Sequence, residues 1–205
     1  MTRSKASPTT SVAPAASAAH STVFERLLAK IAQTLDAADL PYMIIEGQAV
    51  LLYGEPRLTE DVDVTLGADR DALPRVLDLT EDMALSPLVD DPGPFVAETM
   101  VLPCADTDTE VRVDFVFSFS PYERQALGRV RRVELGNASV RFAAPEDVII
   151  HKLVAGRPRD REDVKGILAK GPDLDESYLR RWLDDFANAL GKSLAEQFAD
   201  LRAQA

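Results

Sequence analysis

The chain has 205 residues, of which 46% are hydrophobic and 28% are charged, and its formal net charge is −11. This length suits one domain, or a core domain with a helical extension. The acidic balance argues against sequence-independent binding along a nucleic-acid backbone, which requires a basic surface. The single cysteine, Cys104, excludes an intramolecular disulfide and a thiolate metal cluster, which favours a reducing cytoplasm. No apolar run approaches the roughly 20 residues of a membrane span, so we expect no membrane segment.

The first twenty residues are rich in serine, threonine, alanine and proline and contain no continuous apolar stretch. This composition is typical of a disordered tail rather than of a signal peptide, so we expect residues 1–20 to be disordered. Ordered structure is expected to begin near Ser21, because Thr22 and Glu25 have the spacing of a capping box. A helix follows, with an apolar stripe formed by Val23, Phe24, Leu27, Leu28, Ile31 and Leu35.

The first candidate site follows a buried strand that we expect over Tyr42–Glu46. The strand ends at a turn at Gly47, and a short helix-like segment leads to a second extended run. This run carries Asp61 and Asp63, whose side chains share one face because successive strand residues alternate. Two carboxylates on one face repel each other unless a cation lies between them, and carboxylate oxygens suit Mg²⁺. The pattern therefore predicts a divalent-metal site.

The middle of the chain should alternate between helix, loop and strand. The apolar spacing of residues 69–82 predicts a helix, whereas the three prolines and one glycine of residues 86–95 predict a loop. Residues 98–103 suit a strand, and residues 110–117 predict a clear one.

Asp114 in this last strand is the third candidate carboxylate. It projects from the face opposite to the apolar residues 111, 113, 115 and 117. If the strand pairs beside that of Asp61 and Asp63, three carboxylates converge. The alternative is that Asp114 is a solvated acid or an acid paired with an arginine.

A short helix over residues 120–128 and two strands around Gly136–Asn137 should follow. Four arginines form a basic cluster here: Arg124, Arg129, Arg131 and Arg132. Two interpretations are open. The arginines protect an exposed edge strand from aggregation, or they contact a phosphate backbone.

The C-terminal part predicts helices throughout. Pro145 begins a helix in which Lys152 flanks the buried stripe, and a stop at Gly156 precedes a second helix. Asp160 lies on the apolar side of this second helix, so it requires a cation that Lys152 or Arg157 could supply. The alternative is a first-turn acid that only stabilises the helix terminus. Further apolar stripes, which should pack on these helices, are formed by Tyr178, Leu179, Trp182, Leu183, Phe186, Leu190, Leu194, Phe198 and Leu201.

These residues together resemble the polymerase-β-type nucleotidyltransferase superfamily. Its first motif, a small-residue turn followed by D-x-D, is similar to the set Gly47, Gln48, Ala49, Gly54, Arg57, Thr59, Asp61 and Asp63, and Asp114 resembles its third carboxylate. The segment from Lys152 to Asp163 is similar to the K…R-x-R-D-x-x-D segment of bacterial abortive-infection (AbiEii-like) nucleotidyltransferases and their relatives, some of which are toxins of toxin–antitoxin pairs. The resemblance covers about residues 40–170.

The resemblance implies an α+β nucleotidyltransferase fold, with a mixed β-sheet flanked by helices. Residues 21–143 would form the α/β core, and residues 144–205 would form a C-terminal helical region packed on it. The implied enzyme is a cytoplasmic, magnesium-dependent nucleotidyltransferase that moves a nucleoside monophosphate from NTP to an acceptor hydroxyl. The acceptor would be an RNA 3′ end such as that of tRNA, a protein or a small molecule, and a toxin would also have a cognate antitoxin.

The resemblance also implies a role for each site residue. Asp61 and Asp63 would hold two Mg²⁺ ions, and Asp114 would ligate one of them and assist deprotonation of the attacking hydroxyl. The nucleotide would be bound by Gly47, Gln48, Arg57, Thr59, Lys152, Arg157 and Asp160. In this set, backbone N–H groups contact phosphates, Arg57 and Lys152 neutralise the leaving pyrophosphate, and Asp160 orients Lys152 or Arg157.

One position departs from the family pattern. The family has two small residues at the turn where the triphosphate lies, whereas this chain has Glu46 followed by Gly47. A carboxylate that points into the site would repel a triphosphate, but one that points away at the strand end would not. One alternative to an active enzyme is therefore a catalytically degenerate module that binds nucleotide or a partner, and a second is a metal-binding or structural α/β module of another kind.

Overall fold

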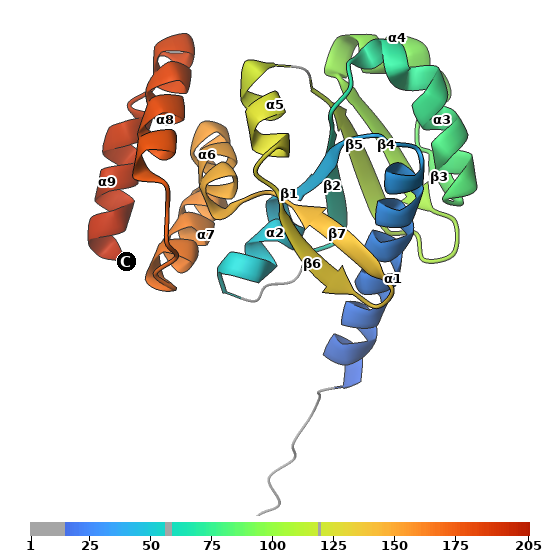
Figure 1. Ribbon diagram of the computed structural model, residues 1–205, viewed down its shortest axis with the longest axis horizontal. Helices are drawn as coiled ribbons and strands as arrows, with labels where there is room; N and C mark the ends of the chain where they lie inside the picture. The colour runs from blue at the N-terminus through green and yellow to red at the C-terminus, as the bar shows by residue number, and fades with distance from the viewer. Residues whose placement is uncertain (1–14, 56–58, 119) are drawn as a thin grey trace, which may run out of the picture.

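The computed structural model describes residues 15–55, 59–118 and 120–205. Seven strands form one mixed sheet in the order β3-β4-β5-β2-β1-β7-β6 (Figure 1). In that order the strands are β3 (Leu85–Pro87), β4 (Val101–Asp106), β5 (Arg112–Phe117), β2 (Asp61–Leu66), β1 (Tyr42–Ile45), β7 (Ala138–Phe142) and β6 (Arg131–Leu135). This confirms the predicted α+β fold with a mixed sheet flanked by helices.

Nine α-helices and one short 3-10 helix occur in the described residues. They are α1 (Ala15–Ala37), α2 (Glu46–Tyr53), the 3-10 helix η1 (Arg70–Ala72), α3 (Leu73–Asp82), α4 (Pro92–Thr99), α5 (Pro121–Leu127), α6 (Pro145–Ala155), α7 (Pro158–Ala169), α8 (Glu176–Leu190) and α9 (Leu194–Gln204). Helices α6 to α9 gather at one side of the molecule, and α3 and α4 lie at the opposite end (Figure 1). Within the described residues, no helix is long and apolar enough to cross a membrane.

The centre of the sheet is formed by β5, β2 and β1. Strand β2 is parallel to β5 and antiparallel to β1. All four residues of β1 are buried, because its sequence Tyr-Met-Ile-Ile is apolar on both faces. In β2 and β5 the apolar residues alternate with polar ones, so one face of each strand packs into the core and the other carries charge.

The chain passes directly from β1 into α2, which places a helix start beside the centre of the sheet. Glu46, which we expected to end the strand, is instead the first residue of α2, and Gly47 lies in its first turn. On the other side, α2 contacts α6 and α7. Helix α2 therefore lies between the charged face of β2 and the C-terminal helices.

Helices α6 and α7 are joined by a tight turn. Gly156 ends α6 with φ 69°, a left-handed conformation that glycine adopts without steric cost, and Pro158 then begins α7. The predicted stripes of α8 and α9 are buried at Tyr178, Leu179, Trp182, Leu183, Leu194, Phe198 and Leu201, and they belong to the same hydrophobic cluster as the sheet. The division into a core and a separate C-terminal region stays a prediction.

Three predictions of local structure differ from the structure. Helix α1 begins at Ala15, so residues 15–20 are not a disordered tail, and residues 1–14 lie outside the described residues. Four of the first five residues of α1 are alanine, the strongest helix former.

The expected loop over residues 86–95 contains the end of β3 and the start of α4. The prolines that suggested a loop are accommodated because Pro92 occupies the first position of α4, where no backbone N–H donor is required. Strand β4 correspondingly begins at Val101 rather than at residue 98.

Candidate active site

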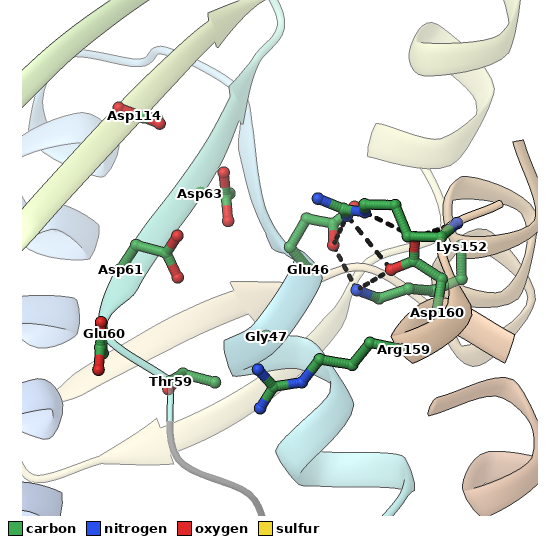
Figure 2. A pocket seen from close by; sticks show the side chains of 11 residues that line it. Glu46, Gly47, Thr59, Glu60, Asp61, Asp63, Asp114, Lys152, Arg159 and Asp160 are labelled. Atoms are coloured by element: carbon green, nitrogen blue, oxygen red, sulfur yellow. Dashed lines mark hydrogen bonds and ion pairs between the residues drawn. The ribbon is translucent and has the colours of Figure 1, made fainter. Parts of the chain in front are cut away.

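A polar cavity of about 570 Å³ lies between the charged face of β2 and β5 and the start of α7. It is lined by Glu46, Gly47, Thr59, Glu60, Asp61, Asp63, Asp114, Lys152, Arg157, Arg159 and Asp160. Figure 2 shows the acids of the strands on one side and the side chains of α6 and α7 on the other. Most of the residues predicted from the sequence to act together therefore line one cavity.

The strand side of the cavity consists of Asp61, Asp63 and Asp114, which we call the carboxylate face. Asp63 and Asp114 are direct partners in the parallel register of β2 and β5. Asp61 lies two residues before Asp63 and is partnered by Arg112. The Nε of Arg112 donates to Oδ1 of Asp114 over 2.8 Å, and the Arg112 side chain is 54% exposed. The three carboxylates thus share one face, and Asp114 also contacts an arginine, so both interpretations of this residue apply.

The charge of the carboxylate face is poorly compensated around Asp63. Burial and, after it, the neighbouring charges of Asp61, Glu46 and Asp114 together raise the pKa of Asp63 to about 7, whereas Lys152 acts in the opposite direction. Each negative neighbour makes ionisation of Asp63 more costly. Asp63 therefore binds a proton at a higher pH than an ordinary aspartate does.

The donor set of the carboxylate face fits a hard divalent cation. All three groups are carboxylates on adjacent strands, and Mg²⁺ is bound by oxygen ligands of this type. A cation would also relieve the repulsion that raises the pKa of Asp63. As the described side chains lie, no group of three His, Cys, Asp or Glu residues converges closely enough to enclose an ion. Ion binding therefore requires adjustment of side-chain rotamers.

The opposite side of the cavity is a network of Glu46, Lys152, Arg157, Asp160 and Asp163, which we call the ion-pair cluster. Nζ of Lys152 contacts the carboxylate of Glu46, lies 3.0 Å from Oδ1 of Asp160 and lies 3.2 Å from Oδ2 of Asp163. Arg157 contacts Glu46 at 3.3 Å and Asp160 at 2.7 Å. The Lys152 side chain is only 2% exposed, so its charge is balanced within the protein.

The ion-pair cluster favours the charged forms of Lys152 and Asp160. Burial alone would lower the pKa of Lys152, but the charge of Glu46 and hydrogen bonds to Glu46 and Asp160 raise it above its usual value. Burial alone would raise the pKa of Asp160, yet hydrogen bonds from Arg157 and Lys152 lower it. Asp160 also accepts from the backbone N–H of Arg157 and so caps α7. Both interpretations of Asp160, as a partner of the cations and as a helix-terminal acid, therefore apply.

Glu46 has an unusual backbone conformation. Its φ of 54° lies in the left-handed region, which costs an L-residue roughly 1–2 kcal/mol relative to glycine. This is the position at which the superfamily pattern has a small residue. The carboxylate contacts Lys152 and Arg157 while lining the cavity. It therefore does not point away at the strand end, and its charge is directed to two cations.

The expected nucleotide-binding residues near α2 lie at the cavity, with one outside the described residues. Gly47 and Thr59 line the cavity. The side chain of Gln48 is buried and donates to Oγ1 of Thr59 over 2.8 Å and to the backbone oxygen of Asp61 over 3.5 Å. Gln48 thereby ties the first turn of α2 to the start of β2. Arg57 lies outside the described residues.

The sequence analysis gave no role to three residues of this region, Glu60, Arg159 and Asp163, although the last two lie in the segment that resembles the family motif. Glu60 and Arg159 line the cavity mouth, and the Arg159 side chain extends toward Thr59 in Figure 2. Asp163 lies one helical turn after Asp160, a spacing that brings two side chains to one face. This spacing was the signal for Asp163, whereas only the folded arrangement brings Glu60 and Arg159 together.

The arginine cluster of residues 124–132 does not form part of the cavity lining. Arg129 contacts Glu146 at 3.3 Å, Asp175 at 3.6 Å and Asp147 at 3.9 Å. Arg131 and Arg132 are exposed on β6, an edge strand of the sheet. The arrangement favours the edge-strand interpretation over a phosphate contact.

The chain is similar to nucleotidyltransferases in sequence pattern and in fold. A family model described as "Nucleotidyltransferase of unknown function (DUF6036)" matches residues 22–197. An antigenic nucleotidyltransferase-like protein from Paracoccidioides brasiliensis has a similar structure, with a TM-score of 0.53 and 16% identity over 85% of this chain and 91% of that chain. No curated protein matches the chain in sequence.

Two antibiotic-modifying or resistance proteins also have a similar fold. The antibiotic-resistance factor ANT(2'')-Ia gives a TM-score of 0.50 and 17% identity over 89% of this chain and 91% of that chain. The lincosamide antibiotic adenylyltransferase LnuA gives a TM-score of 0.50 and 13% identity over 70% of this chain and 95% of that chain. At these identities the likeness concerns the fold alone.

Proposed function

Because the chain belongs to the nucleotidyltransferase family of unknown function DUF6036, we propose that it moves a nucleoside monophosphate from NTP to an acceptor hydroxyl in a magnesium-dependent reaction. One observation carries the proposal. Asp63 and Asp114 are register partners on adjacent parallel strands, and with Asp61 they line a cavity whose other side carries cations. Nucleotidyl transfer requires this combination, because both the triphosphate and its counter-ions must be held in one place.

The carboxylate face is the proposed magnesium site. Asp61 and Asp63 would hold two Mg²⁺ ions, and Asp114 would ligate one of them. Bound Mg²⁺ supplies positive charge that activates an attacking hydroxyl and stabilises the charge developing on the phosphate oxygens. Asp114 is also the proposed acceptor of the proton that the attacking hydroxyl loses. Arg112 engages Oδ1 of Asp114, so we assign Oδ2 as the atom that accepts the proton of the acceptor hydroxyl.

The nucleotide is proposed to lie between the carboxylate face and the start of α7. Backbone N–H groups of Gly47 and Gln48, in the first turn of α2, would donate to its phosphates, since helix starts favour anions. Arg57 and Lys152 would neutralise the leaving pyrophosphate, and Asp160 would hold Lys152 and Arg157 in position. Thr59 would line the nucleotide side of the cavity.

The acceptor is proposed to be a neutral or cationic molecule that carries a hydroxyl, in preference to an RNA 3′ end. The cavity is lined by six acidic residues and three basic ones. Two of those basic residues, Lys152 and Arg157, are already paired with carboxylates, as is Arg129 outside the cavity. A polyanion would therefore meet repulsion along most of its path. A protein hydroxyl is compatible with the same charges.

A turnover assay tests the proposal. The protein is incubated with each labelled NTP, Mg²⁺ and separate pools of small molecules, proteins and total RNA from a bacterial lysate. We expect label to appear in an acceptor, and we expect Asp63→Ala to abolish the transfer without changing the circular-dichroism spectrum. Asp108→Ala removes an exposed aspartate from a turn and serves as the matched control.

The outcomes separate the proposed enzyme from its alternative. Full transfer by Asp63→Ala would show that the assignment of the site is wrong. Magnesium-dependent binding of NTP without transfer to any pool would favour the catalytically degenerate module. Three predictions stay untested: membership of the abortive-infection-like subtype, a toxin role and an antitoxin partner. Growth of cells that express the protein without and with the product of a neighbouring gene tests the toxin role and the antitoxin partner.

A further inference from the structure

The ion-pair cluster holds one carboxylate more than it has cations. Glu46, Asp160 and Asp163 contact Lys152, and two of these three acids also contact Arg157. Asp160 and Asp163 both belong to α7, and Asp160 additionally caps that helix through the N–H of Arg157. Glu46 reaches the cations from α2, on the sheet side of the cavity. Among the described contacts, its carboxylate interacts with these two cations alone.

Glu46 lies between the two charged sides of the cavity. Its predecessor Ile45 is the register partner of Asp63, so the residue begins beside the carboxylate face. Its side chain then extends to Lys152, as Figure 2 shows. An anion that bridges the carboxylate face and Lys152 would therefore lie next to the Glu46 carboxylate, which lines the same cavity.

We propose that the Glu46 carboxylate competes with the nucleotide phosphates for Lys152 and Arg157, and that it thereby sets the affinity of the site for NTP. This inference rests on the proposed function. When the triphosphate binds, Glu46 releases the two cations while Asp160 and Asp163 continue to hold Lys152. Because the side chain of Glu46 is 20% exposed, it can turn toward solvent without leaving a buried carboxylate unpaired.

The test measures binding of MgATP and of magnesium tripolyphosphate by isothermal titration calorimetry. Glu46→Gln removes the charge and keeps the shape, and Glu46→Gly also removes the left-handed strain. We expect both variants to bind the two probes at least about tenfold more tightly than the parent protein, since a like charge leaves the site. In the Glu46→Gln background, Arg157→Ala should reverse most of this gain, because Arg157 is one of the cations that the variant releases.

Glu60→Gln is the matched control, because it removes the same charge from the lining of the same cavity. Among the described contacts, Glu60 makes none with Lys152 or Arg157, so its removal should change affinity by less than about threefold. Unchanged or weaker binding by both Glu46 variants, with the parent protein binding MgATP, overturns the competition and leaves the proposed function intact. Equal gains from Glu46→Gln and Glu60→Gln also overturn it, because they show a general charge effect. Failure of every protein to bind either probe overturns the proposed function together with this inference.

Discussion

The carboxylate face and the ion-pair cluster both place carboxylates at the same cavity, but they differ in how the negative charge of these carboxylates is balanced. Burial raises the pKa of Asp63 to about 7, with Asp61, Glu46 and Asp114 as negative neighbours. Asp160 is also buried, yet hydrogen bonds from Arg157 and Lys152 lower its pKa. In the cluster, both cations contact carboxylates of the protein, and one carboxylate is in excess. At the face, the exposed Arg112 is the only cation in contact with the three carboxylates among the described contacts, and this difference is the reason why we propose the metal site there.

The largest expected effect on stability comes from removing the cation at the centre of the ion-pair cluster. Lys152→Ala leaves the charges of Glu46, Asp160 and Asp163 facing one another with only Arg157 to balance them. We expect the free energy of unfolding to fall by about 3–5 kcal/mol, the usual cost of breaking a buried ion pair. Urea denaturation followed by circular dichroism measures it.

Lys170→Ala is the control for this prediction. Lys170 pairs with Glu55 at 2.8 Å, but both side chains are more than half exposed, so we expect a loss below about 1 kcal/mol. If the two variants lost similar amounts, the ion-pair cluster would be no more than a solvated surface network, and the contrast with the carboxylate face would disappear.

The sequence predicted one side of this comparison well, because strand periodicity is local. The alternation of apolar residues around Asp61, Asp63 and Asp114 predicted their common face, and the register of β2 and β5 brings Asp63 and Asp114 together. The catalytic roles of these residues stay a prediction. A contact between Lys152 and Asp160 was one of two interpretations of Asp160. It could be predicted because the two residues lie in adjacent helices joined by a short turn.

The contact of Glu46 with Lys152 could not be predicted in the same way. It joins residues 106 positions apart, and it depends on how α6 packs against α2. The left-handed backbone of Glu46 is likewise a property of the fold, since only the junction of β1 and α2 imposes it. The start of α4 was missed for a different reason. Prolines that normally indicate a loop are also favoured in the first turn of a helix, and sequence alone does not separate the two cases.

Asp147 provides a test of whether a raised pKa alone marks a functional carboxylate. Burial raises the pKa of Asp147 to about 6, although the hydrogen bond from Tyr178 and the charge of Arg129 act in the opposite direction. Unlike Asp63, this residue does not line the cavity. The titratable and charged groups around it are Arg129, Glu146, Tyr122 and Tyr178.

We expect Asp147→Asn to stabilise the protein above pH 6 and to leave nucleotide transfer unchanged. Because the folded pKa exceeds the ordinary value of 3.8, the folded state binds more protons than the unfolded state between these two values. The contribution of Asp147 to the stability of the parent protein therefore falls as pH rises from about 4 to 6, by a cost on the order of 2–3 kcal/mol. The carboxamide oxygen can still accept from the Tyr178 hydroxyl, which lies 2.6 Å from Oδ1.

Urea denaturation at pH 4.5 and pH 8 tests the sign of this effect. The gain from Asp147→Asn should be present at pH 8 and should shrink toward pH 4.5, whereas the control Asp108→Asn, at an exposed position, should change the free energy of unfolding by less than about 0.5 kcal/mol. A loss of stability at pH 8 would mean that the charged carboxylate is stabilised by Arg129 despite their separation of 3.9 Å. Asp147 would then resemble the ion-pair cluster rather than the carboxylate face.

The smallest expected effect comes from Arg112, a cation supplied by the protein at the carboxylate face. Its Nε contacts Asp114 at 2.8 Å, and its side chain is 54% exposed. Arg112→Ala should change the free energy of unfolding by less than about 1 kcal/mol, because an exposed pair is well screened by water. The same change removes positive charge beside the proposed metal ligands. We therefore expect the concentration of Mg²⁺ at half-saturation to fall by roughly two- to fivefold.

Titration of metal-free protein with Mg²⁺, followed by calorimetry, distinguishes two roles of Arg112. In the first, its positive charge partly replaces that of the metal ion; in the second, it positions the side chain of Asp114. Weaker Mg²⁺ binding by Arg112→Ala would mean that the arginine fixes the rotamer of Asp114 for the ion, and that the face depends on a protein cation as the ion-pair cluster does. Arg202→Ala removes a cation that pairs with Glu176 in the C-terminal helices, so it should leave Mg²⁺ binding unchanged. If Arg112→Ala binds Mg²⁺ more tightly and Arg202→Ala does not, the negative charge of the carboxylate face attracts an external cation, and Arg112 only reduces that attraction.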